Sequence, residues 1–182
     1  MKRRTFNLSL CGVVSALGVA VLMITLVIPT TTYASSALAG ILTGILVIEC
    51  NKKWAIASYI VVSIVSVIIV PDKEAVAFYL LLFGYYPITK QIIEGHIKNK
   101  YIQLLIKIIN FTIPTIACYY LSIFVLNISP DEFNILGVNL PIVFLLIGIV
   151  VFLIFDNALT GLITLYINKY RKKLLGNIKI AD

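Results

Sequence analysis

Charged residues are scarce in this chain, and acidic residues are scarcer than basic ones. Only 13% of the 182 residues are charged, with eight Asp and Glu against fifteen Lys and Arg, and the net charge is +7. The mean hydropathy is +1.03, and a soluble domain of this length cannot hide so much apolar surface, because its own surface must be largely polar. The composition therefore excludes an ordinary soluble domain and predicts that lipid surrounds most side chains.

Residues that carry common active-site chemistry are also few. The chain has one histidine, His96, and three cysteines, Cys11, Cys50 and Cys118. An odd number of cysteines in or beside apolar segments argues against a disulfide framework and gives no support to a thiol nucleophile. The sequence contains no metal-ligand spacing, nucleophile elbow or phosphate-binding glycine motif. We therefore expect no enzyme activity, no cofactor and no resident metal, and an ATP-driven step would need another chain.

The sequence contains several long apolar segments. A bilayer core of about 30 Å takes roughly 20 helical residues, and the apolar runs lack the two-residue alternation of membrane β-strands. We predict an all-α polytopic membrane protein that forms a single integral-membrane domain over residues 1–182, with six transmembrane helices. Their approximate limits are 8–28, 34–48, 54–70, 74–93, 101–126 and 140–167.

Positive charge predicts the orientation of these spans. With a cytoplasmic N-terminus, Lys73 is the only one of the fifteen Lys and Arg residues that lies at an outer end. Because cytoplasmic connections carry an excess of Lys and Arg, both termini are predicted to be cytoplasmic, in a bacterial plasma membrane. The basic ends are interpreted as anchors on anionic lipid and not as a nucleic-acid site. The basic start and the first apolar run also resemble a signal peptide, but that run is longer than the usual hydrophobic region of about 7–15 residues, which favours a retained helix.

Small residues recur along one side of the first span. Gly12, Ala16 and Ala20 are spaced four apart and therefore share one face of a helix. Small side chains allow a second helix to approach closely, which drives packing in lipid. This stripe either docks a partner protein or packs inside the chain's own bundle, and spacing alone favours internal packing.

Asp156 is the acid deepest within a span. An ionised carboxylate at that depth costs several kcal/mol unless it is paired or hydrated. Its expected partners are Lys107 in the fifth span and Lys90 at the inner end of the fourth. This intramembrane polar group is interpreted either as an ion or proton site or as a structural salt bridge between helices, and the salt bridge is favoured.

The segment Phe83-Gly84-Tyr85-Tyr86-Pro87-Ile88-Thr89-Lys90 is expected to bend the fourth span. Pro87 removes one helical hydrogen bond and Gly84 loosens the preceding turn. The two tyrosines and Lys90 act either as interfacial anchors or as parts of a hinge, and the sequence leaves both open.

Polar side chains of the short outer connections form a predicted outer mouth. Hydroxyl, amide and carboxylate groups there are able to hold a small polar ligand, and aromatic rings are able to stack on it. The alternative is that these residues are polar only because water touches them. The candidate ligand-binding residues are Thr32, Tyr33, Ser36, Asp72, Tyr79, Tyr119, Asn127 and Asp131.

Six spans, cytoplasmic termini, about 180 residues and a small-residue stripe in the first helix together resemble the substrate-binding S components of energy-coupling factor (ECF) transporters. The local match is Ala16-Leu17-Gly18-Val19-Ala20, which fits that family's AxxxA stripe. The segments Pro71-Asp72-Lys73-Glu74-Ala75 and 83–90 look like those of an uncharacterised branch of S-component-like proteins from Gram-positive bacteria. The ligand stays open, because no signature for riboflavin, thiamine, biotin or folate is visible.

The resemblance implies a mechanism. An S component captures a vitamin-like molecule or a metal at its outer face, docks through the first helix onto a transmembrane coupling protein, and is driven by two ATPase subunits. Gly12, Ala16 and Ala20 would then form the docking surface. The resemblance does not account for Asp156 or for the Gly84–Pro87 bend.

Two other functions compete with this expectation. A small ion-coupled secondary transporter would use Asp156 and Lys107 as its charge site. A structural or assembly membrane protein would bind no ligand at all. An enzyme within the membrane is the least favoured, since no nucleophile, paired carboxylate or metal cluster is visible.

Overall fold

Helices account for almost all of the described chain. This computed structural model describes the backbone of residues 2–124, 134–135 and 138–171, and the side chains of residues 4–117, 120, 143 and 145–169. The α-helices are α1 (Lys2–Met23), α2 (Thr32–Glu49), α3 (Lys52–Ile69), α4 (Lys73–Phe78), α5 (Tyr86–His96), α6 (Lys100–Phe124) and α7 (Leu140–Leu165). Shorter elements are the 3₁₀ turns Ile24–Leu26 and Pro29–Thr31, the π-helical segments Tyr79–Phe83 and Tyr166–Arg171, and an antiparallel pair of strands, β1 (Asn134–Ile135) with β2 (Val138–Asn139).

Within the part of the chain that the structure describes, five helical stretches are long and apolar enough to cross a membrane, which suggests a multi-pass membrane protein. They are Arg4–Leu26, Pro29–Glu49, Lys52–Ile69, Lys73–His96 and Leu145–Lys169. The expected all-α fold is confirmed. The predicted fifth span, α6, is not among the five; polar side chains in its first half are Lys100, Gln103, Lys107 and Asn110. The sixth crossing and the sidedness of the chain stay predictions.

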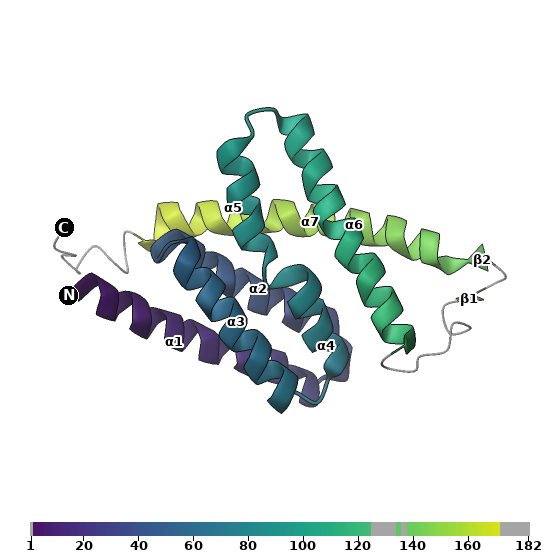
Figure 1. Ribbon diagram of the computed structural model, residues 1–182, viewed down its shortest axis with the longest axis horizontal. Helices are drawn as coiled ribbons and strands as arrows, with labels where there is room; N and C mark the ends of the chain where they lie inside the picture. Colours follow the sequence, from purple (N-terminus) through teal and green to yellow (C-terminus); the bar gives the residue numbers. More distant parts are fainter. Residues whose placement is uncertain (1, 125–133, 136–137, 172–182) are drawn as a thin grey trace.

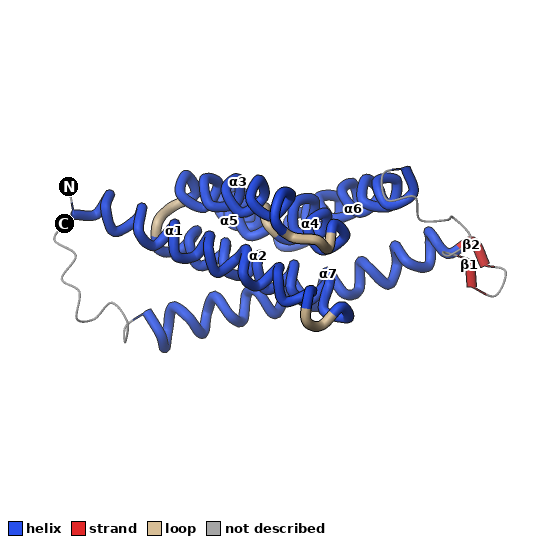
Figure 2. Tube along the Cα trace, turned by 90° about the horizontal axis from the view of Figure 1, so that it is seen from below, coloured by secondary structure: helices blue, strands red, loops and turns tan. Residues whose placement is uncertain are grey.

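Helix α2 lies at the centre of the fold. It contacts α1, α3, α4, α5 and α7, and Figure 2 shows it between α7 and the layer that holds α3, α4 and α5. Its buried positions are mostly small, which lets several helices approach its axis. These positions include Ser35, Ser36, Ala39, Gly40, Thr43 and Gly44.

Two glycines of α2 are seated against the break in the fourth helical stretch. A Cβ at Gly40 would lie 2.4 Å from the carbonyl oxygen of Phe83, and a Cβ at Gly44 would lie 3.4 Å from the Cβ of Pro87. At Gly40 the obstacle is backbone, which a side-chain rotation cannot relieve. The sequence of α2 therefore fixes where the broken helix crosses it.

The bend expected around Gly84 and Pro87 is present as a break between two helices. The π-helical segment Tyr79–Phe83 follows α4, and the amide of Gly84 donates to the carbonyl of Tyr79 at 2.7 Å. Pro87 lies in the first turn of α5, where its missing N–H costs nothing. π-Helical insertions of this kind are frequent at functional sites.

Polar residues close the turn between α3 and α4. The ammonium of Lys73 donates to the carbonyls of Val67 at 2.7 Å and Val70 at 2.9 Å, and so caps the end of α3. Asp72 caps α4 by accepting from the amide of Ala75 at 3.0 Å. The one basic residue predicted to lie outside thus has a structural role of its own.

The turn between α5 and α6 projects from the other helices (Figure 1). In Figure 1 the N-terminus and the α2–α3 turn lie toward the left, and the α3–α4 turn lies at the opposite end of these helices. Helix α5 and the first part of α6 rise steeply from α7, so the link 97–99 stands beside the bundle. Helix α7 runs along the length of the molecule and crosses both of them (Figures 1 and 2).

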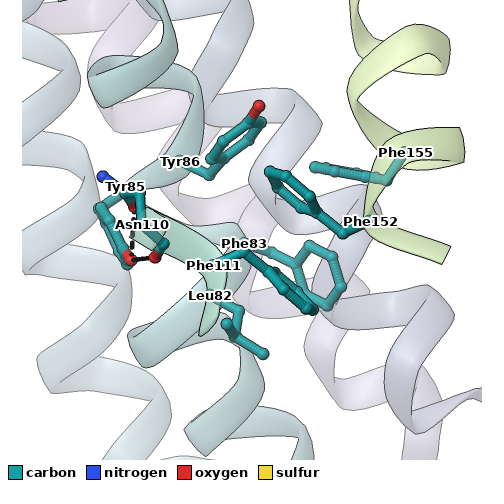
Figure 3. Close-up of a pocket in the computed structure, with 8 residues that line it drawn as sticks. All are labelled: Leu82, Phe83, Tyr85, Tyr86, Asn110, Phe111, Phe152 and Phe155. Carbon is teal, nitrogen blue, oxygen red and sulfur yellow. Dashed lines mark hydrogen bonds between the residues drawn. The ribbon is translucent and has the colours of Figure 1, made fainter. Parts of the chain in front are cut away.

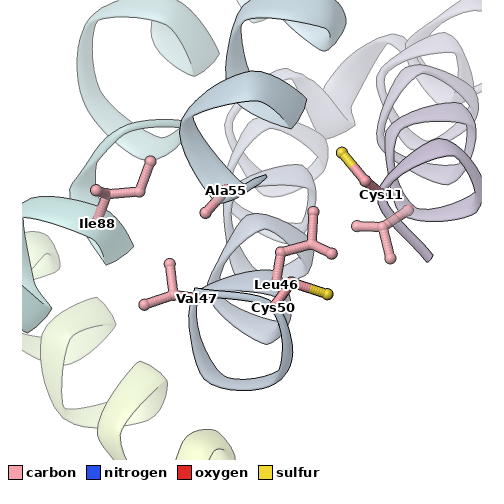
Figure 4. Close-up of a cluster of buried hydrophobic side chains, with 7 residues drawn as sticks. Cys11, Leu46, Val47, Cys50, Ala55 and Ile88 are labelled. Carbon is pink, nitrogen blue, oxygen red and sulfur yellow. The ribbon is translucent and has the colours of Figure 1, made fainter. Parts of the chain in front are cut away.

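The apolar core consists of three clusters. One joins α1, α2, α3 and α5 around Leu46 and Ala55 (Figure 4), and a second joins α1 to the π-helical segment around Leu22 and Tyr79. The third joins the broken helix to α6 and α7 around Phe152. The third cluster borders the main group of buried charges.

Candidate functional site

Three charged side chains from three helices meet in the described interior. The ammonium of Lys90 on α5 contacts one carboxylate oxygen of Asp156 on α7, and the ammonium of Lys107 on α6 lies 3.0 Å from the other. Their exposed fractions are 2% for Lys90, 6% for Lys107 and 9% for Asp156. The structure thus brings together the three residues expected to form the intramembrane polar group.

Glu94 completes this group and balances its charge. Its Oε1 lies 2.6 Å from the ammonium of Lys107 and 3.4 Å from that of Lys90. Two lysines and two carboxylates together carry no net charge, which lowers the cost of burying them. The side chain of Glu94 is 39% exposed, so the group reaches the surface on one side. We call Lys90, Glu94, Lys107 and Asp156 the charge cluster.

Two hydroxyl groups hold the charge cluster in place. The hydroxyl of Tyr86 donates to Asp156 at 2.6 Å. Lys90 also donates to the hydroxyl of Thr160 at 2.8 Å and to the backbone carbonyl of Asp156 at 3.0 Å. Thr160 in turn donates to that carbonyl at 2.9 Å. The carboxylate of Asp156 therefore accepts three side-chain donors, and its charge is well compensated in low dielectric.

The charge cluster has two chemical capabilities. First, its ion pairs join α5, α6 and α7. Removing one member would leave an uncompensated buried charge, so these contacts stabilise the packing of the three helices. A change in protonation of one carboxylate would also release a lysine, since each ammonium is held chiefly by carboxylate oxygens. The first capability is structural and the second is the basis of ion or proton coupling.

An aromatic wall lies beside the charge cluster. Tyr86 packs edge-on against Phe152 with ring centroids 4.9 Å apart, and Phe152 stacks on Phe111 at 4.5 Å (Figure 3). The hydroxyl of Tyr85 donates to the side chain of Asn110 at 3.0 Å. The space among these side chains admits no water molecule. The wall is therefore packed core that shields the charges and not an open ligand site.

At the predicted outer mouth, the start of α2 is bound to the start of α4. The hydroxyl of Thr32 donates to Asp72 at 2.9 Å, and the hydroxyl of Tyr33 donates to Glu74 at 2.9 Å. The buried Ser36 donates to the carbonyl of Ala75 at 2.7 Å. In this conformation the polar groups of the mouth are engaged with one another.

Tyr79 does not lie at the mouth. It is fully buried, and its hydroxyl lies 3.3 Å from that of Thr43 on α2. The π-helical segment turns its ring into the second core cluster. The expectation that Tyr79 would stack on a ligand at the surface is therefore corrected. Asn127 and Asp131 lie outside the described residues, as does the side chain of Tyr119.

The small-residue stripe of α1 faces outward. Gly12, Ala16 and Ala20 are all exposed, and a Cβ at Gly12 would meet nothing within 4 Å. The buried positions of α1 lie on another face and include Ser15, whose hydroxyl is 2.7 Å from that of Ser58 on α3. Internal packing, the alternative favoured from spacing, is therefore not what this stripe does in the structure.

Two members of the site escaped the sequence interpretation. Glu94 is not predicted from the sequence, although it lies one helical turn beyond Lys90, the spacing of a helical ion pair. Tyr86 was assigned to an anchor or hinge, and nothing in the sequence indicated that it faces Asp156. Among the described residues, no three His, Cys, Asp or Glu side chains gather to hold a metal ion.

No known protein family, curated protein or solved structure matches this chain.

Proposed function

We propose that this chain is the substrate-binding membrane subunit of an ECF-type importer for a vitamin-like small molecule or a metal. The observation that carries the proposal is the exposed stripe of Gly12, Ala16 and Ala20 on α1. A helix face with small side chains makes little contact with lipid chains but lets another helix approach closely. The same face is the one that the S-component resemblance assigns to docking.

One face of α1 packs inside the chain, and the other is left for docking of a partner. Cys11, Val14 and Leu22 are buried and hold α1 in its own bundle. The stripe adds nothing to that packing, so a partner is able to cover it without unfolding the chain. In the proposed assembly the partner is a transmembrane coupling protein that is itself bound to two ATPase subunits.

Solute capture is proposed for the end of the bundle where α2 and α4 begin. Thr32 and Asp72, together with Tyr33 and Glu74, form polar bonds between α2 and α4. A polar solute would replace these bonds with its own, so that binding would separate the two helix ends. With both termini cytoplasmic and six crossings, this end of the chain faces outward.

Copurification tests the docking proposal. The full chain, tagged at one end and extracted from its native membrane, is expected to bring with it a multi-span protein and two ATPase subunits. Ala16→Leu and Ala20→Leu are each expected to lower the recovered partner about tenfold or more, because one large side chain breaks close helix packing. The matched control is Ala57→Leu, which adds the same bulk at an exposed position of α3. Recovery of an intact complex from both α1 variants would overturn the proposal.

The charge cluster favours a second candidate, a small ion-coupled secondary transporter. Lys90, Lys107 and Asp156 are buried while Glu94 is 39% exposed, so in this function Glu94 is the member of the cluster through which a proton would enter. In this function, protonation of a carboxylate frees Lys107 or Lys90 and loosens α6 from α7.

Energy dependence separates the two candidates. Uptake of the solute that copurifies with the chain, identified by mass spectrometry, is measured in cells depleted of ATP and in cells whose proton gradient is collapsed. An importer driven by ATPase subunits loses uptake in the first case, and a proton-coupled transporter loses it in the second. A chain with no copurifying solute and no partner would instead fit a structural membrane protein.

A further inference from the structure

A polar cavity lies where α1, the α2–α3 turn and α5 come together. Its volume is about 550 Å³, within the range of small-ligand sites. It is separate from both the charge cluster and the predicted outer mouth. The polar and aromatic side chains that line it are Asn7, Glu49, Asn51, Lys53, Trp54 and Gln91.

The lining offers groups of both charges. Lys53 supplies a cation and Glu49 a carboxylate, with an indole N–H from Trp54. Three carboxamides add donors and acceptors, while Val47 and the buried Cys50 give the cavity an apolar side (Figure 4). Such a set suits a ligand that carries a positive and a negative group and has an apolar portion, because each charge then meets its opposite.

In a membrane crossed by the candidate spans, the cavity would lie near their ends, at the level of the lipid headgroups. It opens at the ends of the candidate spans that hold Asn7, Glu49 and Lys53, and Trp and Lys are typical of the membrane–water interface. Exposed apolar side chains continue from its rim along two helices, beginning with Leu8 on α1 and Ile56 on α3. Acyl chains lying along these helices would place their headgroup at the cavity.

We infer that this cavity binds the headgroup of a phospholipid that carries a primary ammonium, of the phosphatidylethanolamine type. Lys53 and the carboxamide N–H groups face the phosphate, and Glu49 accepts from the ammonium. A carboxylate has about four lone-pair sites, so Glu49 is able to accept a ligand N–H in addition to bonds within the chain. The inference is independent of the proposed transport function, because neither the α1 stripe nor the charge cluster takes part.

Headgroup chemistry sets the expected selectivity. A choline headgroup has the same charge but no N–H to donate to Glu49, and a glycerol headgroup has the phosphate but no cation. Loss of one charge-assisted hydrogen bond weakens binding by about tenfold. Phosphatidylethanolamine is therefore expected to bind about tenfold more tightly than phosphatidylcholine or phosphatidylglycerol of the same acyl composition.

Trp54 gives a direct readout, because it is the only tryptophan of the chain. The full chain in detergent is titrated with dioleoyl lipids of the three headgroups in mixed micelles, and Trp54 fluorescence is followed. Soluble glycerophosphoethanolamine is titrated in a fourth arm, to separate a lipid from a free headgroup. The lipid is expected to shift the emission at lower concentration than the soluble headgroup.

Lys53→Met tests the phosphate contact, and Lys52→Met is the matched control, since Lys52 precedes Lys53 but does not line the cavity. Lys53→Met is expected to raise the half-saturating concentration of phosphatidylethanolamine about tenfold, and Lys52→Met to leave it unchanged. Glu49→Gln is expected to abolish the preference over phosphatidylcholine while leaving the Lys53 effect in place.

Three outcomes would overturn the inference. Equal titration curves for the three lipids would exclude headgroup recognition. An equal effect of Lys52→Met and Lys53→Met would reduce it to general attraction by basic residues. Binding of glycerophosphoethanolamine as tight as that of the lipid would assign the cavity to a soluble zwitterion instead.

Discussion

Glycine positions on α2 and α1 illustrate two opposite uses of a small residue. At Gly40 the backbone of Phe83 occupies the space that a side chain would take, since a Cβ would lie 2.4 Å from the carbonyl oxygen of Phe83. At Gly12 a Cβ would meet nothing within 4 Å. The first glycine is needed for folding within the chain, whereas the second is left available on the surface.

Gly40→Ala is therefore expected to destabilise the protein although alanine favours helix, because the α4–α5 break must move away from α2. A loss of about 1–3 kcal/mol is expected, seen as a lower melting temperature in detergent. Gly12→Ala is the matched control and is expected to leave the melting temperature unchanged or slightly higher, since alanine is the better helix former. Equal melting temperatures for the two variants would contradict the close approach at Gly40.

Cys50 is expected to react slowly with alkylating reagents. Burial, with the nearby Cys11 and Glu49 groups, raises the pKa of the Cys50 thiol to about 11, and the thiolate is the reactive form. The thiol is thus neutral at pH 7, and its alkylation rate should keep rising as pH increases past 9. An exposed thiol, with a pKa near 8.5, would instead reach a plateau.

The measurement uses iodoacetamide on a chain whose Cys11 and Cys118 are replaced by alanine. A control chain also carries Cys50→Ala with Lys98→Cys, which places a thiol at an exposed position. A Cys50 rate that levels off near pH 9 in the folded protein, as the control does, would show that the thiol is not buried.

At the scale of elements, the break in the fourth helical stretch determines where the buried charges lie. In an uninterrupted helix, the directions of the Tyr86 and Lys90 side chains would follow from that of Tyr79 by regular helical rotation. The π-helical segment and the turn before Tyr86 reset that face, so that Tyr86 and Lys90 both reach Asp156. The bend is thereby tied to the charge cluster, a connection that no sequence pattern predicts.

Charge balance should govern the stability of α5, α6 and α7. Asp156→Leu leaves Lys90 and Lys107 with Glu94 alone and is expected to cost about 3–5 kcal/mol. The double variant Asp156→Leu with Lys107→Met leaves a neutral Lys90–Glu94 pair and is expected to recover part of that loss. Thermal unfolding in detergent measures both, and a double variant that loses the sum of the two single effects would contradict the coupling.

Tyr86→Phe tests the contribution of the Tyr86 hydroxyl to the charge cluster. Its ring contacts with Phe152 are kept, while the bond to Asp156 at 2.6 Å is lost. Removing one donor to a buried carboxylate is expected to cost about 1–3 kcal/mol. Tyr85→Phe, which removes a half-buried hydroxyl that bonds to Asn110 instead, is the control and is expected to cost less.

Particular residues show what the sequence was able to predict. Scarcity of charge made Lys90 and Lys107 the natural partners of Asp156, because few other cations lie within a span. Periodicity predicts the helices but not their neighbours, so Tyr79 was expected at the surface and the stripe of α1 was expected inside the bundle. Glu94 is not predicted, because its polarity resembles that of the link that follows it. Contacts between distant helices depend on packing, which single-sequence patterns do not encode.

At the scale of the whole molecule, the two sides of α1 and the two ends of the bundle differ in kind. One face of α1 is packed and the other carries the small stripe. One end of the bundle holds hydroxyl–carboxylate bonds between α2 and α4, and the other holds the cavity around Trp54. The proposed subunit would meet a solute at the first end, a lipid at the second and a protein partner along the stripe of α1.

Crosslinking from α1 in living cells tests the central claim most directly. A diazirine analogue of leucine is placed at position 17, where Leu17 is 49% exposed beside the stripe, or as a control at position 64, where Ile64 is 58% exposed on α3. We predict an adduct with one multi-span coupling protein from position 17 and not from position 64, and its loss when Ala16 and Ala20 are both changed to leucine. Adducts with lipid alone from both positions would contradict docking through α1.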